Sequence, residues 1–447
     1  MTIIEITKAR FEALCFLRLP TAKLFSEERE WYTDQNENVL GVVLFDTVDE
    51  DWSYVVLGRD EVARFRGIDN DVSLHTIEEA WNVLHEKMSQ YSTAGKHIFS
   101  QGVERKGQKV FRIFHPVVAT EHLSPDFLVL SKGTGYSPAK QVIAEIAYTF
   151  EDPDGNYIQQ FQSEGFDARL WELFLYTILH ENDFFIDRHY KAPDYVCIKY
   201  GQTIVLEATT VNPTQVPGGK QASEETLKGI HLADYMAIKF GSALFSKLQK
   251  RYWELNHAEG HPLILAVADF RKPQGVTYSA KFLMEYLYAL RQNEEGDSIC
   301  YTTLTEHIFN EKRIPSGFFY LKDTENIAAV LFSDNGTISK FNRMGKLAGF
   351  GSPDVMMIRI GERYENLESD VPSEFRIVVD PSHYKETWSE GIWILHNPNA
   401  KYPLARQLFS NAAHVYLENG ELITYLTEAF PIWSKTLILS VEEKHKK

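Results

Sequence analysis

The sequence has few cysteines, no long apolar run and no excess of positive charge. Its 447 residues include only three cysteines, far apart and without a CxxC pair, which argues against a zinc ribbon or a disulfide framework. No window approaches about 18 consecutive apolar residues, so we expect no membrane span. The formal net charge of −16 argues against non-specific attraction of the whole surface to nucleic acid, so such a partner needs a local basic patch.

The N-terminus also lacks a basic segment followed by an apolar stretch, and so does not resemble a secretory signal peptide. With the few, separated cysteines, this predicts a cytoplasmic protein. The chain is rich in hydrophobic residues (44%) and aromatic residues (13%), which is typical of a folded globular protein. A chain of this length is expected to form two or three domains.

We expect an α/β protein, α+β overall, with three regions. Residues 1–125 are predicted to form an N-terminal β-rich region, because runs between 39 and 67 alternate as a meander. Residues 160–345 are expected to form a central α/β domain with a mixed sheet flanked by helices. Residues 346–447 follow as a C-terminal α+β region.

Local patterns add further elements. Residues 74–89 have helical spacing behind the capping residue Thr76. Short apolar runs predict strands at 109–118 and 127–131. The run 327–341 predicts a hairpin that turns around the sequence Asp334-Asn335-Gly336.

Residues 192–213, APDYVCIKYGQTIVLEATTVNP, contain two β-like runs with an acid near each outer end. Acids are depleted in strands, so these two need an explanation. A two-residue Gly201-Gln202 turn of type II′ would pair Asp194 with Thr209 and make Glu207 a diagonal neighbour of Asp194, roughly 7–8 Å away. All three side chains then share one face. Two carboxylates at this spacing can hold one hard cation such as Mg²⁺.

The surrounding elements strengthen this interpretation. A strong amphipathic helix over 165–183 precedes the hairpin, and a long helix over 231–255 and a buried strand over 261–270 follow it. Pro193-Asp194, the hairpin and Glu207-Ala208-Thr209, set among these elements, resemble the PD-(D/E)xK nuclease superfamily, which has the restriction-endonuclease-like fold. The resemblance covers residues 165–270 only.

The resemblance implies a metal-dependent endonuclease that hydrolyses phosphodiester bonds, with DNA as the expected substrate. Asp194 and Glu207 would bind Mg²⁺ or Mn²⁺, and Glu172 on the preceding helix would support the metal directly or through water. A water held by the metal would attack the phosphodiester. The flanking regions would select the substrate or assemble the protein as a homo-oligomer.

One departure from the family pattern affects catalysis. The family has a lysine two residues after the glutamate, where this chain has Thr209, and threonine supplies no positive charge to the phosphate. A displaced lysine could come from the loop after the hairpin (Lys220) or from the long helix (Lys239, Lys247). We favour Lys247, because it follows the small residues Gly241-Ser242-Ala243, which would let the helix pack closely on a sheet. The helix also carries a modest basic patch, made by Lys239, Lys247, Lys250 and Arg251.

Three alternatives remain open from the sequence. The chain could be a catalytically inactive nuclease-fold protein that binds nucleic acid or a protein partner, because Thr209 replaces the lysine. It could be an unrelated α/β binding protein, in which Asp194 and Glu207 point apart. The two acids could also be solvated ends of an edge hairpin, where charges protect against aggregation.

Overall fold

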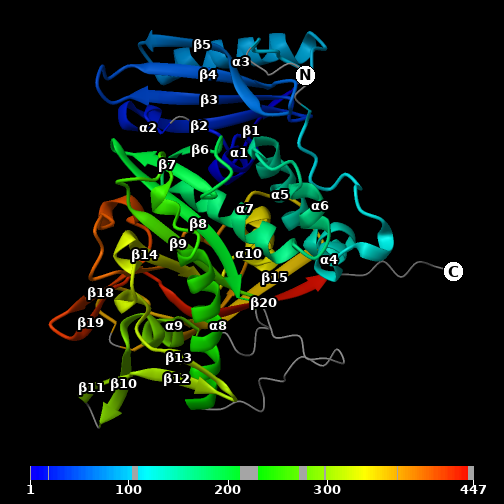
Figure 1. Ribbon diagram of the computed structural model, residues 1–447. Helices are drawn as coiled ribbons and strands as arrows, with labels where there is room; N and C mark the ends of the chain where they lie inside the picture. The colour runs from blue at the N-terminus through cyan, green and yellow to red at the C-terminus, as the bar shows by residue number, and fades with distance from the viewer. Residues whose placement is uncertain are drawn as a thin grey trace.

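The computed structural model describes residues 2–18, 20–102, 109–211, 230–270, 279–295, 298–369 and 371–440. In these ranges the chain is a mixed α/β protein with sheets of five, eight and three strands and two separate two-stranded hairpins (Figure 1). In Figure 1 the five-stranded sheet lies at the top and the eight-stranded sheet below it.

The N-terminal sheet confirms the predicted meander. Its antiparallel strands follow chain order: β1 (Ile3–Glu5), β2 (Ser26–Asp34), β3 (Val39–Asp46), β4 (Trp52–Arg59) and β5 (Phe65–Leu74). The predicted helix is α3 (Ile77–Thr93), whose N-terminus is capped because the Thr76 side chain accepts the backbone N–H of Glu79. Leu84 and Met88 of α3 are buried against the sheet. They pack so closely on Gly41 of β3 that a Cβ at this position would collide with both side chains.

The eight-stranded sheet has the order β19-β18-β17-β14-β9-β8-β7-β6. β8, β9 and β14 are parallel to one another, whereas β6, β7 and β8 form an antiparallel meander. The strands are β6 (Phe185–Asp187), β7 (Tyr195–Lys199), β8 (Gln202–Val211), β9 (Leu263–Asp269), β14 (Ile327–Ser333), β17 (Trp393–His396), β18 (Ala413–Glu418) and β19 (Glu421–Tyr425). The sheet therefore takes strands from both the expected 160–345 domain and the expected 346–447 region.

Two apolar clusters cover the two faces of this sheet. Alternate residues of β8, such as Leu206 and Ala208, pack with α7 in one cluster, and Val205 and Val211 pack with α8 in the other. All seven residues of β9 are buried, as expected for a strand covered on both faces. The helices are α1 (Lys8–Leu14), α2 (Ala22–Phe25), α4 (Pro125–Lys132), α5 (Ser137–Thr149), α6 (Tyr157–Gln162), α7 (Phe166–Glu181), α8 (Ile230–Leu248), α9 (Ser279–Tyr288) and α10 (Ile338–Leu347).

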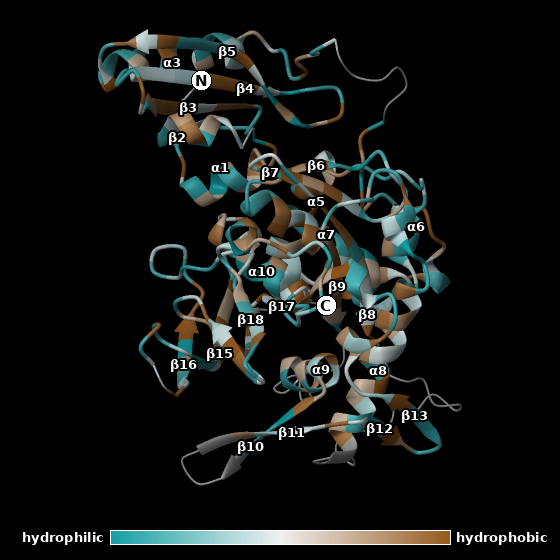
Figure 2. Cartoon of the chain, turned by 60° about the vertical axis from the view of Figure 1, so that its left-hand side comes forward, coloured by the Kyte–Doolittle hydropathy of each residue, from teal (hydrophilic) through white to brown (hydrophobic). Residues whose placement is uncertain are grey.

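Smaller elements complete the described chain. The three-stranded sheet has the order β16-β15-β20, and the hairpins β10-β11 and β12-β13 lie near the lower end of α8 in Figures 1 and 2. Figure 2 shows apolar residues concentrated along the strands and the inner faces of the helices. These strands are β10 (Leu290–Glu295), β11 (Ser298–Thr303), β12 (Glu306–Phe309), β13 (Lys312–Pro315), β15 (Val355–Arg363), β16 (Ser373–Val378) and β20 (Pro431–Ser440), and the short 3-10 helices are Thr120–His122, Thr134–Tyr136, Tyr252–Glu254, Phe318–Tyr320, Thr324–Asn326 and Arg406–Phe409.

Two predicted strands are wrong. Residues 109–118 contain no strand, and the apolar run 127–131 lies in the helix α4. The helix begins at Pro125, a residue suited to a first helical turn, and buries Phe127 and Leu130 with the i, i+3 spacing of one helical face. A run of four apolar residues (Phe127 to Leu130) does not distinguish these two structures.

The predicted hairpin around Asp334-Asn335-Gly336 is also wrong, because β14 ends at Ser333 and α10 begins at Ile338. Neither Asn335 nor Gly336 has the positive φ that a type I′ turn requires. Gly336 is needed for a different reason: a Cβ at this position would lie 2.7 Å from the Trp171 ring.

Candidate site at the open end of the hairpin

The hairpin forms, but its turn differs from the predicted one. The loop is Tyr200-Gly201, and both residues have positive φ, 51° and 72°, as in a type I′ turn rather than a type II′ turn. Lys199 pairs with Gln202 and Tyr195 with Leu206, so the pairing differs from the predicted one by two residues. Because faces alternate with a period of two, the side chains predicted to share a face still do so.

Asp194 and Glu207 consequently lie opposite each other rather than diagonally, when the register of β7 and β8 is continued by one residue. Each carboxylate is bound by the other strand. Oε2 of Glu207 accepts the backbone N–H of Asp194 at 3.2 Å, and Oδ2 of Asp194 accepts the backbone N–H of Ala208 at 2.7 Å. The two side chains therefore do not point apart, and they are not solvated ends of an edge strand, because β8 is flanked by β7 and β9.

α8 brings a lysine to this pair of acids. The Lys247 ammonium donates to Oε1 of Glu207 at 2.5 Å, from the last turn of the helix. Oε1 also accepts the Tyr252 hydroxyl at 2.7 Å. Glu207 is 5% exposed, so these bonds offset the loss of water around its carboxylate. We expected the small residues around Gly241 to let α8 pack closely on the eight-stranded sheet. Instead, a Cβ at Gly241 would collide with the side chains of Tyr286 and Ile314, which do not belong to that sheet.

Glu172 of α7 is the third expected acid, and an arginine holds it. Nη1 of Arg169 lies 2.7 Å and 2.8 Å from the two carboxylate oxygens, one helical turn away. Glu172 is 6% exposed, and burial raises the pKa of its carboxyl while Arg169 opposes that shift. α7 is tied to the hairpin, because the Tyr195 hydroxyl donates to the Glu172 carbonyl at 2.6 Å.

Asp194 differs from the other two acids in having no ion pair within the described ranges. Burial first, and then the charges of Glu207 and Glu172, raise the pKa of Asp194 well above its ordinary value. The cation Arg188 lies nearby, but its guanidinium donates to the carbonyls of Glu151 and Asp194. Asp194 is thus a half-buried acid close to two other carboxylates, without a cation on its own carboxylate.

The other lysine candidates and Thr209 lie as follows. Thr209 is half-buried and shares the α8-facing side of β8 with Glu207. Lys239 lies two turns before Lys247 on α8, with its ammonium 5.8 Å from the centre of the Tyr235 ring. Lys220 lies outside the described residues.

The donor set can be compared with the needs of a divalent cation. Within the described ranges, no three or more His, Cys, Asp or Glu side chains are grouped so that they could hold a metal ion. Asp194 and Glu207 therefore offer two carboxylates, and Glu172 is bound to Arg169. Mg²⁺ usually takes one or two carboxylates and completes its shell with waters and substrate phosphates. The oxygen donors fit such an ion, and a bound cation would favour the charged form of Asp194 and so oppose the upward shift of its pKa.

An aromatic pair lies beside the site. The Tyr190 ring stacks on His257, with centroids 3.8 Å apart and planes at 14°. Nε2 of His257 lies 2.8 Å from the Ala192 carbonyl, which ties this pair to the segment leading into Asp194. Tyr190 remains 38% exposed, so part of its ring faces solvent.

Sequence reasoning missed several of these residues. The i, i+3 spacing of Arg169 and Glu172 is a recognisable signal for an ion pair on one helical face. Tyr252 gives no such signal, because it follows α8 and reaches Glu207 from 45 residues away. Arg188 precedes Asp194 by six residues, and nothing local indicates that its side chain turns inward.

Comparison with known proteins gives no further assignment. No protein-family model matches the chain, and no curated protein or solved structure matches it significantly. No helix in the part of the chain that the structure describes is both long and apolar enough to cross a membrane.

Proposed function

We propose that this chain is a metal-dependent nuclease of the PD-(D/E)xK type, with a displaced lysine. The observation that carries the proposal is the meeting of Asp194, Glu207 and Lys247 at one end of the β7–β8 hairpin. Two carboxylates and a lysine are the side chains that the resemblance assigns to the reaction, although the lysine here comes from a helix.

The order of elements supports the same proposal. α7, the antiparallel β7–β8 pair, α8 and the buried parallel strand β9 follow one another as the resemblance to the restriction-endonuclease-like fold leads us to expect. Glu172 lies on α7 and Lys247 on α8, so elements on opposite faces of the sheet both reach the hairpin.

Each side chain has a role that follows from its contacts. Asp194 and Glu207 would hold Mg²⁺ or Mn²⁺, and such an ion, when bound, stabilises charge on a phosphate and lowers the pKa of a nearby water. Lys247 would provide positive charge to the scissile phosphate in place of Thr209. The Glu172–Arg169 ion pair would influence the charge around Asp194 and Glu207, and the Tyr252 hydroxyl would orient the Glu207 carboxylate.

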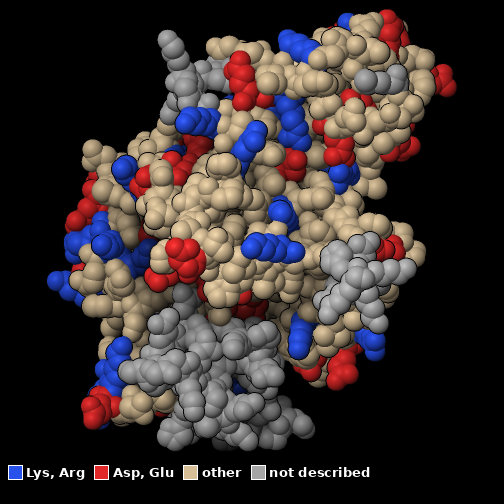
Figure 3. All heavy atoms as spheres, turned by 90° about the vertical axis from the view of Figure 1, so that its right-hand side faces the viewer, with Lys and Arg blue, Asp and Glu red and all other residues tan. Residues whose placement is uncertain are grey.

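A local surface, rather than the net charge, would bind the nucleic acid. Figure 3 shows acidic and basic side chains interspersed on the face that it presents. The exposed Tyr190 ring offers a surface on which a base can stack, and its place four residues before Asp194 limits the Cα–Cα separation to roughly 14 Å. We propose DNA with an accessible unpaired base as the substrate.

A plasmid-nicking assay tests the proposal. The wild-type protein should convert supercoiled plasmid to open circles with Mg²⁺ or Mn²⁺ and not with EDTA, and Glu207→Gln should abolish the conversion. Asp323→Asn is a matched control, because Asp323 pairs with Arg251 on the surface and does not contact the hairpin acids. Nicking by Glu207→Gln at the wild-type rate would refute the assignment.

A second candidate function also has specific support. The chain could be a nuclease-fold protein that binds nucleic acid or a protein partner without cleaving it. Thr209 lacks a charge, and Arg169 and Lys247 already neutralise two of the three acids. Binding of oligonucleotide without cleavage under any divalent cation, and without loss of binding in Glu207→Gln, would favour this function.

A further inference from the structure

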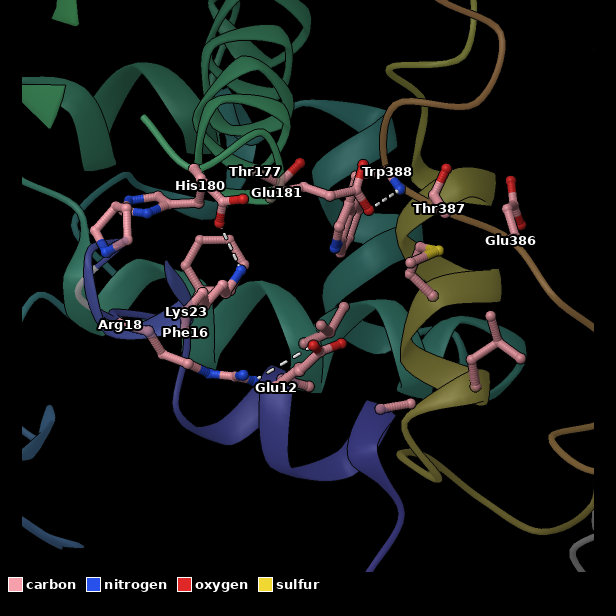
Figure 4. Close-up of a pocket in the computed structure, with 17 residues that line it drawn as sticks. Glu12, Phe16, Arg18, Lys23, Thr177, His180, Glu181, Glu386, Thr387 and Trp388 are labelled. Atoms are coloured by element: carbon pink, nitrogen blue, oxygen red, sulfur yellow. Dashed lines mark hydrogen bonds and ion pairs between the residues drawn. The ribbon is translucent and has the colours of Figure 1, made fainter. Parts of the chain in front are cut away.

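The three-stranded sheet β16-β15-β20 has one packed face and one exposed face. On the inner face, Val355 and Met357 of β15 are buried in a small apolar cluster. Glu386 joins this side to the rest of the fold, because its carboxylate pairs at 2.7 Å with Lys340 and Arg343 of α10. Figure 4 shows the segment that carries Glu386 beside α10, with the cavity of about 270 Å³ that both line. The inner face is therefore packed against the body of the protein.

The outer face of the same sheet is apolar and exposed. Side chains alternate along β15, so Met356 and Ile358 point away from the buried side. Ile358 pairs with Val378 of β16 and Leu437 of β20, and Met356 pairs with Leu439, so all five share this face. The exposed fraction is 54% for Met356, 51% for Val378 and 54% for Leu439. The open side of an antiparallel sheet is normally polar, so this face is an unpartnered apolar surface.

The residues of this outer face lie in rows across the strands, and the rows have an internal symmetry. In order along β15, the first row is Met356 with Leu439, the middle row is Ile358 with Val378 and Leu437, and the third row is Ile360 with Arg376 and Lys435. When the register of β15 and β16 is continued, the exposed Asp380 falls in the first row. On β16 an acid and a base therefore stand at equal distances on either side of the apolar Val378.

We propose that this outer face is the interface of a homodimer, in which two copies pack their three-stranded sheets face to face. The two-fold axis would run across the strands at the middle row, so that this row packs on the same row of the second copy. Arg376 of each copy would then meet Asp380 of the other, because the axis exchanges the first and third rows. Lys435 would extend its aliphatic stem over Leu439 of the second copy and keep its ammonium in water.

The size of the face fits a weak, reversible dimer. Three strands about 4.8 Å apart, with side chains on one face repeating every 6.8 Å or so, give a patch of roughly 14 Å by 27 Å over four rows. Two such patches amount to roughly 800 Å², which is at the low end of specific interfaces. We therefore expect folded monomers that associate at micromolar concentration.

A lipid surface fits this face less well than a second copy does. Membrane surfaces attract basic residues, and Arg376 and Lys435 alone would suit one. The next row, however, carries the acids Glu362 and Glu374, and the whole chain has a net charge of −16. The acids on this face and the symmetric placement of Arg376 and Asp380 favour a second copy.

Sedimentation velocity of the full-length protein, from roughly 1 to 200 µM, tests the proposal. The wild type should shift from monomer to dimer as its concentration rises. Ile358→Lys puts two ammonium groups on the axis and should weaken dimerisation at least about 100-fold, because like charges meet in an apolar interface. Leu437→Lys replaces it if that variant does not fold, as judged by thermal unfolding. Val72→Lys is the matched control, because Val72 is 61% exposed on β5, and should dimerise as the wild type does.

A charge pair locates the axis. The proposed packing puts residue 378 of one copy opposite residue 378 of the other, at an exposed position where either charge is compatible with folding. Val378→Lys and Val378→Glu should each dimerise roughly tenfold more weakly than the wild type. An equimolar mixture of the two variants should recover most of this loss, because opposite charges then meet.

Four results would overturn the proposal. They are a wild type that stays monomeric at the highest concentration, a dimer that is unchanged in a folded Ile358→Lys or Leu437→Lys variant, and no recovery in the mixture of Val378 variants. The fourth is a monomeric wild type that sediments with phosphatidylcholine vesicles and loses this in Ile358→Lys, which would assign the face to a lipid surface. No nucleic acid or metal takes part in these measurements, so their result does not depend on the nuclease proposal.

Discussion

The Lys247 ammonium lies 2.5 Å from Oε1 of Glu207, although 40 residues separate them along the chain. The lysine reaches this acid from the last turn of α8, whereas Thr209 occupies the neighbouring same-face position on β8. A positive charge is therefore present beside the hairpin acids without a lysine on the strand. Two experiments test whether this charge serves catalysis: removing it from α8, and placing a lysine on the strand instead.

Removing the charge should stop cleavage without preventing metal binding. Lys247→Met keeps the length of the side chain, so we expect cleavage to fall by about 100-fold or more, as when one preorganised donor to a developing charge is lost. Calorimetric titration with Mn²⁺ should show affinity equal to or greater than that of the wild type, because a competing cation has left Glu207. Lys281→Met on the exposed surface of α9 is the control, because this lysine belongs neither to the site nor to the basic patch. Full activity of Lys247→Met would refute a catalytic role for this residue.

Returning the lysine to the strand should restore activity. Thr209→Lys in the Lys247→Met background puts an ammonium on the same face as Glu207, two residues along β8. We expect plasmid nicking to recover by at least about tenfold over Lys247→Met alone. If the wild type proves inactive, Thr209→Lys alone should create cleavage. A folded double variant as inactive as Lys247→Met would show that the two positions are not equivalent.

Glu172 should matter less than Asp194. Both oxygens of Glu172 bind Arg169, so it acts on the site mainly through charge. Glu172→Gln should reduce nicking roughly 10- to 100-fold, in the range of residues that support metal ligands, and Asp194→Asn should reduce it further. The opposite order of the two rates would make Glu172 the direct ligand.

The exposed ring of Tyr190 should contribute to binding an unpaired base. Tyr190→Ala should weaken binding of a single-stranded DNA oligonucleotide roughly 5- to 100-fold, and Tyr190→Phe should not, because stacking needs only the ring. Fluorescence anisotropy with Ca²⁺ in place of Mg²⁺ measures this without cleavage. Tyr320→Ala changes a tyrosine that is 53% exposed elsewhere on the surface and should have no effect. Equal losses in the Ala and Phe variants would argue against stacking.

Two buried histidines predict loss of stability in acid. Nε2 of His396 lies 2.9 Å from Nδ1 of His414, and His414 donates its other N–H to the Phe409 carbonyl. Burial, with His414 and Arg406 adding to it, lowers the pKa of His396 to about 3, and burial also lowers that of His414. The unfolded chain therefore takes up protons first as the pH falls below about 6.5.

Because the folded protein binds fewer protons than the unfolded chain, the contribution of these two histidines to the unfolding free energy is complete above pH 6.5. This contribution falls as the pH is lowered towards 3. Between pH 7.5 and 5, each histidine should remove at most about 2 kcal/mol from the unfolding free energy. Urea denaturation at the two pH values measures the loss, and His396→Gln should make it smaller. A wild-type stability that is higher at pH 5 than at pH 7.5 would contradict the assignment of neutral, buried rings.

The prediction that the hairpin acids share a face was correct although the predicted turn was wrong, because side chains alternate between the two faces of a strand. Gly201-Gln202 fits a type II′ turn, but Tyr200 also adopts a positive φ, and this moved the loop by one residue. Moving a two-residue loop by one residue shifts the pairing by two, which returns each side chain to its original face. A shift of one in the pairing would have put Glu207 on the α7 side of the sheet.

The parts that failed depend on tertiary packing rather than on local pattern. The run 127–131 is compatible with a strand or a helix. It forms a helix in which Phe127 and Leu130 are buried on one face. Gly336 sits under the Trp171 ring, a contact across 165 positions of sequence numbering that no local rule predicts. Of the cations around the acids, Lys247 was predicted from the small residues before it, whereas Arg169 and Arg188 were missed.

The most direct test of the central claim is a crystal of the protein soaked in Mn²⁺ and measured for anomalous scattering. We predict one strong peak within bonding distance of carboxylate oxygens from both Asp194 and Glu207, which is lost in Asp194→Asn. A peak elsewhere, or none at this hairpin at an Mn²⁺ concentration where the protein nicks plasmid, would contradict the assignment of these two acids as the metal site.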